Sequence, residues 1–148
     1  MPKSKKELTV RSVAPALTGD AEHPLLYASQ PAAGFPAPGD DLVEQPLDLN
    51  DLLIDNPTAT FFVKVSGDSM EGAKIFDGDI LVIDRSVEAK AGLIVVAAVY
   101  GELVVKRLQK TSTGLALVSE NTEYQPILID DTEGCFIWGV VTGSVRVL

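Results

Sequence analysis

Residues 60–70 read TFFVKVSGDSM and contain the signal that decides the fold. The first six of these residues are rich in β-branched and aromatic side chains, which are enriched in strands. Ser66-Gly67-Asp68 is then typical of a tight turn. We expect the turn to present Ser69 outward, with the backbone N–H groups of Asp68 and Ser69 available as oxyanion donors. An ordinary β-turn without a catalytic role is the alternative, and is the commoner use of such a sequence taken alone.

The chain after residue 47 repeats this pattern of short apolar runs separated by Gly, Asp and Asn turns. A short helix is expected over residues 48–54, where Asp48 can cap the first turn. Tyr100-Gly101 predicts a hairpin between two of the runs. Strands are expected at residues 60–65, 80–83, 92–99, 103–108, 115–118, 127–129 and 136–147. The sequence therefore predicts a mainly β domain over residues 47–148.

The first 46 residues have a different composition. They contain seven of the nine prolines, which excludes a regular helix and predicts an extended, mobile N-terminal arm. The segment is also too irregular for a helix-turn-helix DNA-binding unit, which needs two periodic helices.

Composition narrows the class of protein. A chain of 148 residues with 46% hydrophobic and 22% charged residues fits one soluble globular domain. Of the formal charge of −9, residues 1–33 carry +1 and the rest of the chain −10, which disfavours direct binding to nucleic acid and favours protein partners. No apolar stretch is long enough to span a membrane, and the single cysteine fits a reducing cytoplasm. The paired acids Asp40-Asp41 and Asp130-Asp131 lack further ligands at the spacing that a metal site needs. We therefore expect neither a metal nor another cofactor.

A serine becomes a nucleophile when a nearby base removes its proton. The only histidine, His23, lies in a polar stretch far along the chain from Ser69. A Ser-His-Asp triad is therefore disfavoured, and a neutral lysine is the candidate base.

Lys106 interrupts an apolar run and is that candidate. Strand alternation places it on the same face as Val104 and Leu108, with Arg107 facing solvent. Burial lowers the pKa of a lysine because it disfavours the charged form, and a neutral lysine can accept the proton of Ser69 Oγ. The alternative is an edge lysine that deters aggregation.

The segment PAAGFP at residues 31–36 is a candidate substrate within the same chain. Its small residues allow an extended backbone to approach a nucleophile closely, and its prolines discourage secondary structure that would hide it. The bond between Ala33 and Gly34 is the candidate cleavage site. A second Ala-Gly pair, Ala91-Gly92, leads straight into an apolar run that we expect to be buried, so it is not a credible substrate.

Together these residues resemble the UmuD family, within the wider group of LexA-like self-cleaving Ser-Lys peptidases. The resemblance extends from Ala32 to about Val141. The motifs that carry it are Ala33-Gly34-Phe35-Pro36, Val43-Glu44-Gln45, Asp48-Leu49-Asn50, Ser66-Gly67-Asp68-Ser69-Met70, Asp77-Gly78-Asp79, Val105-Lys106-Arg107-Leu108 and Trp138-Gly139-Val140-Val141.

The resemblance implies a LexA/signal-peptidase-type β fold, with Ser69 as nucleophile and Lys106 as general base. It implies cleavage between Ala33 and Gly34, promoted by RecA on single-stranded DNA during the SOS response. The shortened product would act as a homodimer with a UmuC-like Y-family polymerase in error-prone translesion synthesis.

Three alternatives stay open from the sequence. One is a relative of the LexA repressor, although the arm cannot supply the DNA-binding domain of a repressor. Another is a peptidase acting on other chains, related to signal peptidase, against which the lack of an apolar span counts. The third is an interaction module in which Ser69 and Lys106 no longer catalyse.

Overall fold

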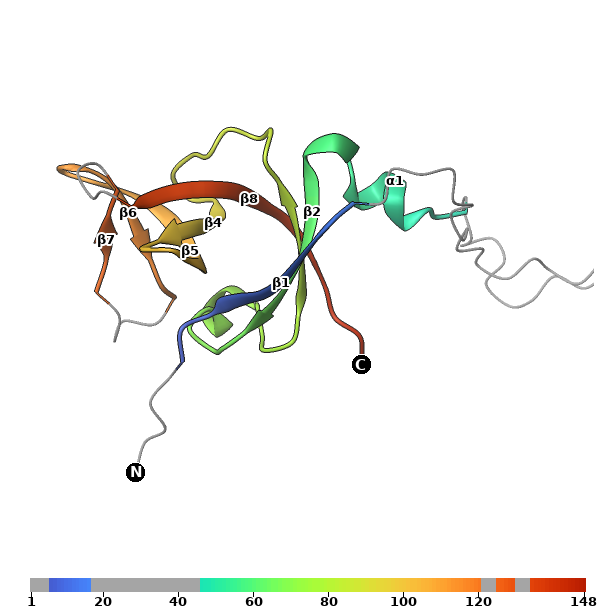
Figure 1. Ribbon diagram of the computed structural model, residues 1–148, viewed down its shortest axis with the longest axis horizontal. Coiled ribbons are helices and arrows are strands. Elements are labelled where there is room, and N and C mark those ends of the chain that lie inside the picture. Colours follow the sequence, from blue (N-terminus) through green and yellow to red (C-terminus); the bar gives the residue numbers. More distant parts are fainter. Residues whose placement is uncertain (1–5, 17–45, 121–124, 130–133) are drawn as a thin grey trace, which may run out of the picture.

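The computed structural model describes residues 6–16, 46–120, 125–129 and 134–148. These residues form one sheet with short helical turns, so the predicted mainly β class is confirmed (Figure 1). The helical elements are α1 (Leu49–Leu53), η2 (Pro57–Ala59) and η3 (Glu71–Ala73). The strands are β1 (Thr9–Pro15), β2 (Thr60–Ser66), β3 (Ile80–Asp84), β4 (Ile94–Val99), β5 (Glu102–Thr111), β6 (Gly114–Val118), β7 (Ile127–Leu128) and β8 (Cys135–Val145). None of the helices in these ranges has the length and apolar character that a membrane span requires.

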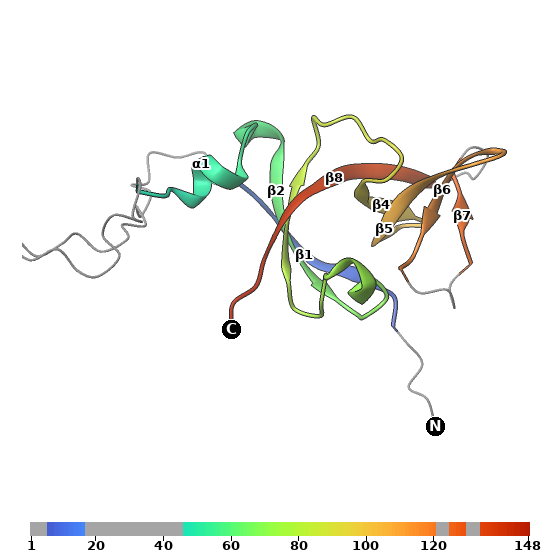
Figure 2. The same ribbon diagram turned by 180° about the vertical axis from the view of Figure 1, so that it is seen from behind.

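The strands are joined in the order β1-β2-β3-β8-β4-β5-β6-β7, with every pairing antiparallel. An additional pairing between β1 and β5 closes part of this sheet into a ring. Viewed from either side, the long curved β8 runs from the β4–β7 end of the molecule to the β1–β3 end (Figures 1 and 2). One strand thus ties the two ends of the sheet together.

Local sequence accounts for the turns that were predicted. Tyr100 and Gly101 both have positive φ, as a two-residue hairpin between β4 and β5 requires. Asp48 caps α1 by accepting a hydrogen bond of 2.8 Å from the backbone N–H of Asn50. The hairpin and the short helix are therefore confirmed.

The predicted arm over residues 1–46 needs one correction. Residues 9–15 are not a mobile segment but strand β1, which pairs along its length with β2. Pro15 does not prevent this, because β1 pairs with β5 only at Thr9 and is an edge strand at Pro15, where proline is tolerated. Residues 17–45 lie outside the described residues, and the boundary at residue 46 stays a prediction.

The ring encloses a core that ties β1, β2 and β5 together. Leu8, Val63, Val65, Met70 and Val105 are among its members, and each is fully buried. A second apolar cluster lies between β4, β5, β6 and β8. Because β5 contributes Val105 to the first cluster and Val104 and Leu108 to the second, an apolar cluster packs on each face of this strand.

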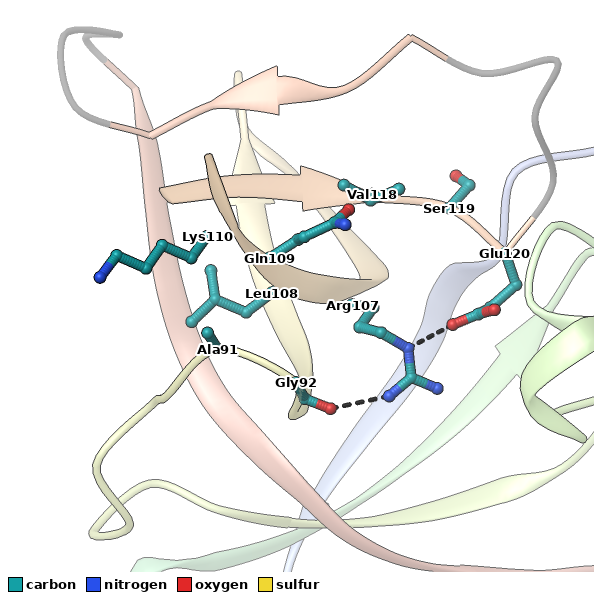
Figure 3. A pocket seen from close by; sticks show the side chains of 9 residues that line it. All are labelled: Ala91, Gly92, Arg107, Leu108, Gln109, Lys110, Val118, Ser119 and Glu120. Atoms are coloured by element: carbon teal, nitrogen blue, oxygen red, sulfur yellow. Dashed lines mark hydrogen bonds and ion pairs between the residues drawn. The ribbon is translucent and has the colours of Figure 1, made fainter. Parts of the chain in front are cut away.

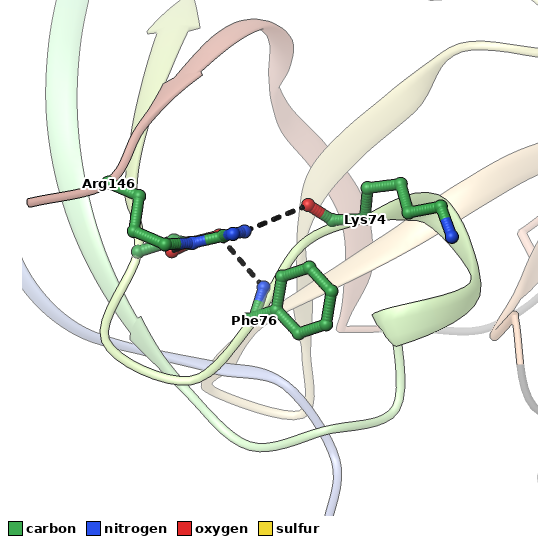
Figure 4. A network of polar contacts seen from close by, with 4 residues as sticks. Lys74, Phe76 and Arg146 are labelled. Atoms are coloured by element: carbon green, nitrogen blue, oxygen red, sulfur yellow. Dashed lines mark hydrogen bonds and ion pairs between the residues drawn. The ribbon is translucent and has the colours of Figure 1, made fainter. Parts of the chain in front are cut away.

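Asp79 links the C-terminal end of the chain to the turn before β3. Its carboxylate accepts hydrogen bonds from Arg146 Nε at 2.8 Å and Nη2 at 3.0 Å, and from the Phe76 N–H at 2.8 Å. The Arg146 guanidinium also stacks over the Phe76 ring at 4.3 Å and donates to the Lys74 carbonyl (Figure 4). The bonds from Arg146 lower the pKa of Asp79, while burial opposes them.

We predict that Asp79→Asn lowers the free energy of unfolding at pH 7 by about 1–3 kcal/mol, because it removes a charged acceptor from a buried network. Since the folded-state pKa of Asp79 is depressed, its contribution is present above the unfolded value near 4 and is lost as pH falls below it. Urea unfolding of both proteins at pH 7 and at acid pH measures this. A stability difference that is the same at both pH values would contradict the prediction.

Candidate active site

Hydrogen bonds join the turn that carries Ser69 to the turn at residues 77–79, just before β3. Gly67 adopts φ +123° and donates its N–H to Asp77 Oδ1 at 2.9 Å. This bond, with one from the Ser66 side chain, lowers the pKa of Asp77. The Gly78 N–H donates to the Val65 carbonyl at 2.8 Å, which fixes the two turns against each other. The Asp77-Gly78-Asp79 motif therefore positions the residues around Ser69.

Ser69 does not point into solvent as expected. Its residue exposure is 1%, and its Oγ accepts a hydrogen bond of 2.8 Å from the Leu8 N–H. The reason is that residues 6–8 cover the turn, a contact that links positions far apart in the sequence. The expected outward orientation is therefore wrong in this conformation.

Lys106 lies on β5 and is 1% exposed, as the strand alternation predicted. Its Nζ donates to Ser119 Oγ at 2.7 Å and forms an ion pair with the Glu7 carboxylate. The paired oxygen of Glu7 is itself buried. A buried ammonium is tolerated only with such partners, so these contacts explain how the lysine fits inside the sheet.

Arg107 occupies the opposite, partly exposed side of the strand, also as predicted. Its guanidinium contacts the Glu120 carboxylate and donates to the Gly92 carbonyl at 2.7 Å (Figure 3). These groups border a pocket lined by Ala91, Gly92 and residues 107–110 and 118–120. Ser119 belongs both to this lining and to the contacts of Lys106, while Lys106 itself does not line the pocket.

Two consecutive residues connect the predicted catalytic side chains. Glu7 pairs with Lys106 and Leu8 binds Ser69, so both side chains lie against the same short piece of backbone. The predicted oxyanion donor Asp68 gives its N–H to the Lys6 carbonyl at 2.9 Å. The structure thus brings the predicted nucleophile, base and Asp68 donor to one segment of chain. Ala33 and Gly34, the predicted cleavage site, lie outside the described residues.

Sequence reasoning missed Glu7 and Ser119. The register of the β5–β6 hairpin pairs Arg107 with Val118, which brings the next residue, Ser119, toward Lys106. If the strand pairing is extended residue by residue from the turn at Gly114, Ser119 falls opposite Lys106, so this contact could have been predicted. Glu7 gives no such signal, because no local pattern links it to a strand a hundred positions later.

The arrangement defines a class: a β-sheet protein with a buried serine and a buried lysine beside a bound extended segment. In the comparison with known proteins, residues 24–142 match the Peptidase S24-like family. The chain belongs to this family, and the resemblance inferred from its motifs is confirmed at that level.

Its relatives are similar over most of their length. Protein MucA of Salmonella typhimurium is 43% identical over 120 residues, which cover 80% of this chain and 82% of that protein. Protein ImpA of Shigella flexneri is 43% identical over 122 residues, which cover 82% of each. The LexA repressor of Thiobacillus denitrificans is 37% identical over 82% of this chain but only 61% of its own length.

We predict that Ser119→Ala lowers the free energy of unfolding by about 1–3 kcal/mol, because Lys106 loses a buried hydrogen-bond acceptor. Ser119→Thr keeps the hydroxyl and should lose less. Ser112→Ala, at an exposed position in the turn of the same hairpin, is the matched control and should change stability by less than about 0.5 kcal/mol. Equal urea midpoints for Ser119→Ala and Ser112→Ala would show that the bond to Lys106 adds nothing.

Proposed function

We propose that the chain is a self-cleaving serine peptidase that cuts its own backbone between Ala33 and Gly34. Ser69 is the nucleophile, Lys106 the general base, and the N–H groups of Asp68 and Ser69 stabilise the oxyanion. The observation that carries the proposal is that Ser69 and Lys106, both 1% exposed, contact adjacent residues of one extended segment of the same chain. A site that already holds its own backbone in extended form is suited to hold another stretch of it.

The reaction follows from these groups. Neutral Lys106 takes the proton of Ser69 Oγ, which attacks the carbonyl carbon of Ala33 and places the negative charge on its oxygen. The lysine then returns the proton to the Gly34 nitrogen as the peptide bond breaks, leaving an acyl ester on Ser69. Water then gives a proton to the same amine and attacks the ester carbon. The lysine passes that proton to Ser69 Oγ as the ester bond breaks, which releases residues 1–33 with a carboxylate on Ala33.

We propose further that the product acts as a cytoplasmic homodimer with a UmuC-like Y-family polymerase in SOS mutagenesis, and that a RecA filament promotes the cut. The similarity to proteins MucA and ImpA over about four fifths of the chain supports this role. The net charge of −9 favours contact with proteins over direct contact with DNA. A filament that favours the conformation with residues 31–36 at Ser69 needs to add no catalytic group.

A non-catalytic interaction module is the second candidate. It is favoured by one observation: in this conformation Glu7 pairs with the lysine that must be neutral to act. Mass spectrometry of the purified protein after incubation at alkaline pH separates the two candidates, because only a peptidase yields a fragment beginning at Gly34.

We predict that Ser69→Ala and Lys106→Ala each abolish the appearance of that fragment, and that the double variant is no worse than either single one, because the two side chains act as a unit. Intact mass and circular dichroism, measured on the same samples, give cleavage and folding together. Substantial cutting by folded Lys106→Ala protein would exclude the lysine as the base.

The rate of cutting should also depend on pH. Because the amine acts only after it has lost its proton, the rate should rise as pH increases and then level off. A time course of fragment formation between about pH 6 and 10 measures the profile. A flat profile in protein that stays folded would contradict a titrating base.

A further inference from the structure

Residues 6–10 occupy the position of an added β-strand between the Ser69 turn and β5. The Asp68 N–H donates to the Lys6 carbonyl at 2.9 Å, and the Val105 N–H donates to the Leu8 carbonyl at 3.0 Å. Thr9 is in register with Ser66 on one side and with Val104 on the other. Backbone hydrogen bonds on both sides show that the segment is inserted between two neighbouring parts of the sheet, a known mode of binding an extended peptide.

The fit of this segment is close. A Cβ built on Gly67 would lie 2.2 Å from the Glu7 carbonyl oxygen, so only glycine allows the Glu7–Leu8 peptide to lie on the turn. The Leu8 side chain is fully buried in the core cluster that contains Met70 and Val105. These contacts hold the Leu8 side chain in the core and the Glu7 carboxylate against Lys106.

The same contacts make the bound segment unreactive. Ser69 Oγ accepts a bond from the Leu8 N–H, in the plane of the peptide, whereas attack requires approach to a carbonyl carbon from outside that plane. The Glu7 carboxylate contacts Lys106 Nζ, the atom that would take the proton of Ser69. The Asp68 N–H, a proposed oxyanion donor, is bonded to the Lys6 carbonyl.

We infer that residues 65–69 and 104–106 form a binding site for an extended peptide, here called the strand site, and that residues 6–10 are its resting occupant. This rests on the proposed function, because the occupant matters only if residues 31–36 must reach Ser69. The two segments then exclude each other. Residues 6–10 leave the strand site before the chain can cut itself, and their affinity for it sets the rate of spontaneous cleavage.

The first test measures spontaneous cleavage in full-length variants at constant pH. Glu7→Gln removes the ion pair and should speed cleavage by about fivefold, the effect of one modest charge pair. Leu8→Ala removes the buried anchor and should speed it by about tenfold or more. Val13→Ala, on the exposed side of β1 and outside the strand site, is the matched control and should leave the rate unchanged. Unchanged or slower cleavage by folded Glu7→Gln and Leu8→Ala overturns the inference.

The second test has no need of cleavage and is made in the Ser69→Ala background. Hydrogen exchange of the Val105 and Asp68 amides reports on the strand site directly, because their acceptors belong to residues 6 and 8. Adding Leu8→Ala should lower the protection of these two amides by about tenfold or more while the β3 and β8 amides keep theirs. Equal loss of protection across the sheet overturns the inference, because it means that the segment is an inseparable strand of the fold. If no form of the protein cuts itself, the proposed function fails, and this second test still decides whether the segment is a separable occupant.

Discussion

Lys106 is a buried lysine on a β-strand, and the structure around it must provide polar partners for its amine. An ammonium at 1% exposure needs hydrogen-bond acceptors or a counter-charge, since desolvating it alone would cost several kcal/mol. Ser119 supplies the acceptor from the end of β6 and Glu7 supplies the charge from the N-terminal segment. The register of one hairpin and the path of residues 6–8 are both tied to this single side chain.

The local elements of the fold could be predicted because their signals are local. β-branched runs, the Tyr100-Gly101 turn and the Asp48 cap each involve residues a few positions apart. Strand β1 could not be predicted in the same way. Its partners are β2 and β5, more than forty residues away, and the prolines around it give a stronger local signal for an irregular chain.

In the candidate site, too, the features with local sequence signals could be predicted and those that depend on distant contacts could not. Ser69 and Lys106 could be chosen from residue type and strand alternation, and the burial of Lys106 followed from its apolar neighbours. The burial of Ser69 could not be foreseen, because Leu8 covers it from a distant part of the chain. Glu7 could not be predicted for the same physical reason. Its partner Lys106 is far away in the sequence, and no local pattern indicates their ion pair.

The closure of the ring by β1 also fixes an order of events during synthesis. Thr9 leaves the ribosome early, but its partners Ser66 and Val104 belong to strands that are made much later. The β2–β3 and β4–β5 hairpins join neighbouring stretches of chain and can form as soon as each is complete, whereas β1 must wait for both. Of the described strands β1 is thus translated first, but its pairing with β5 cannot form until Val104 has been made, so residues 6–10 cannot complete their contacts until most of the chain exists.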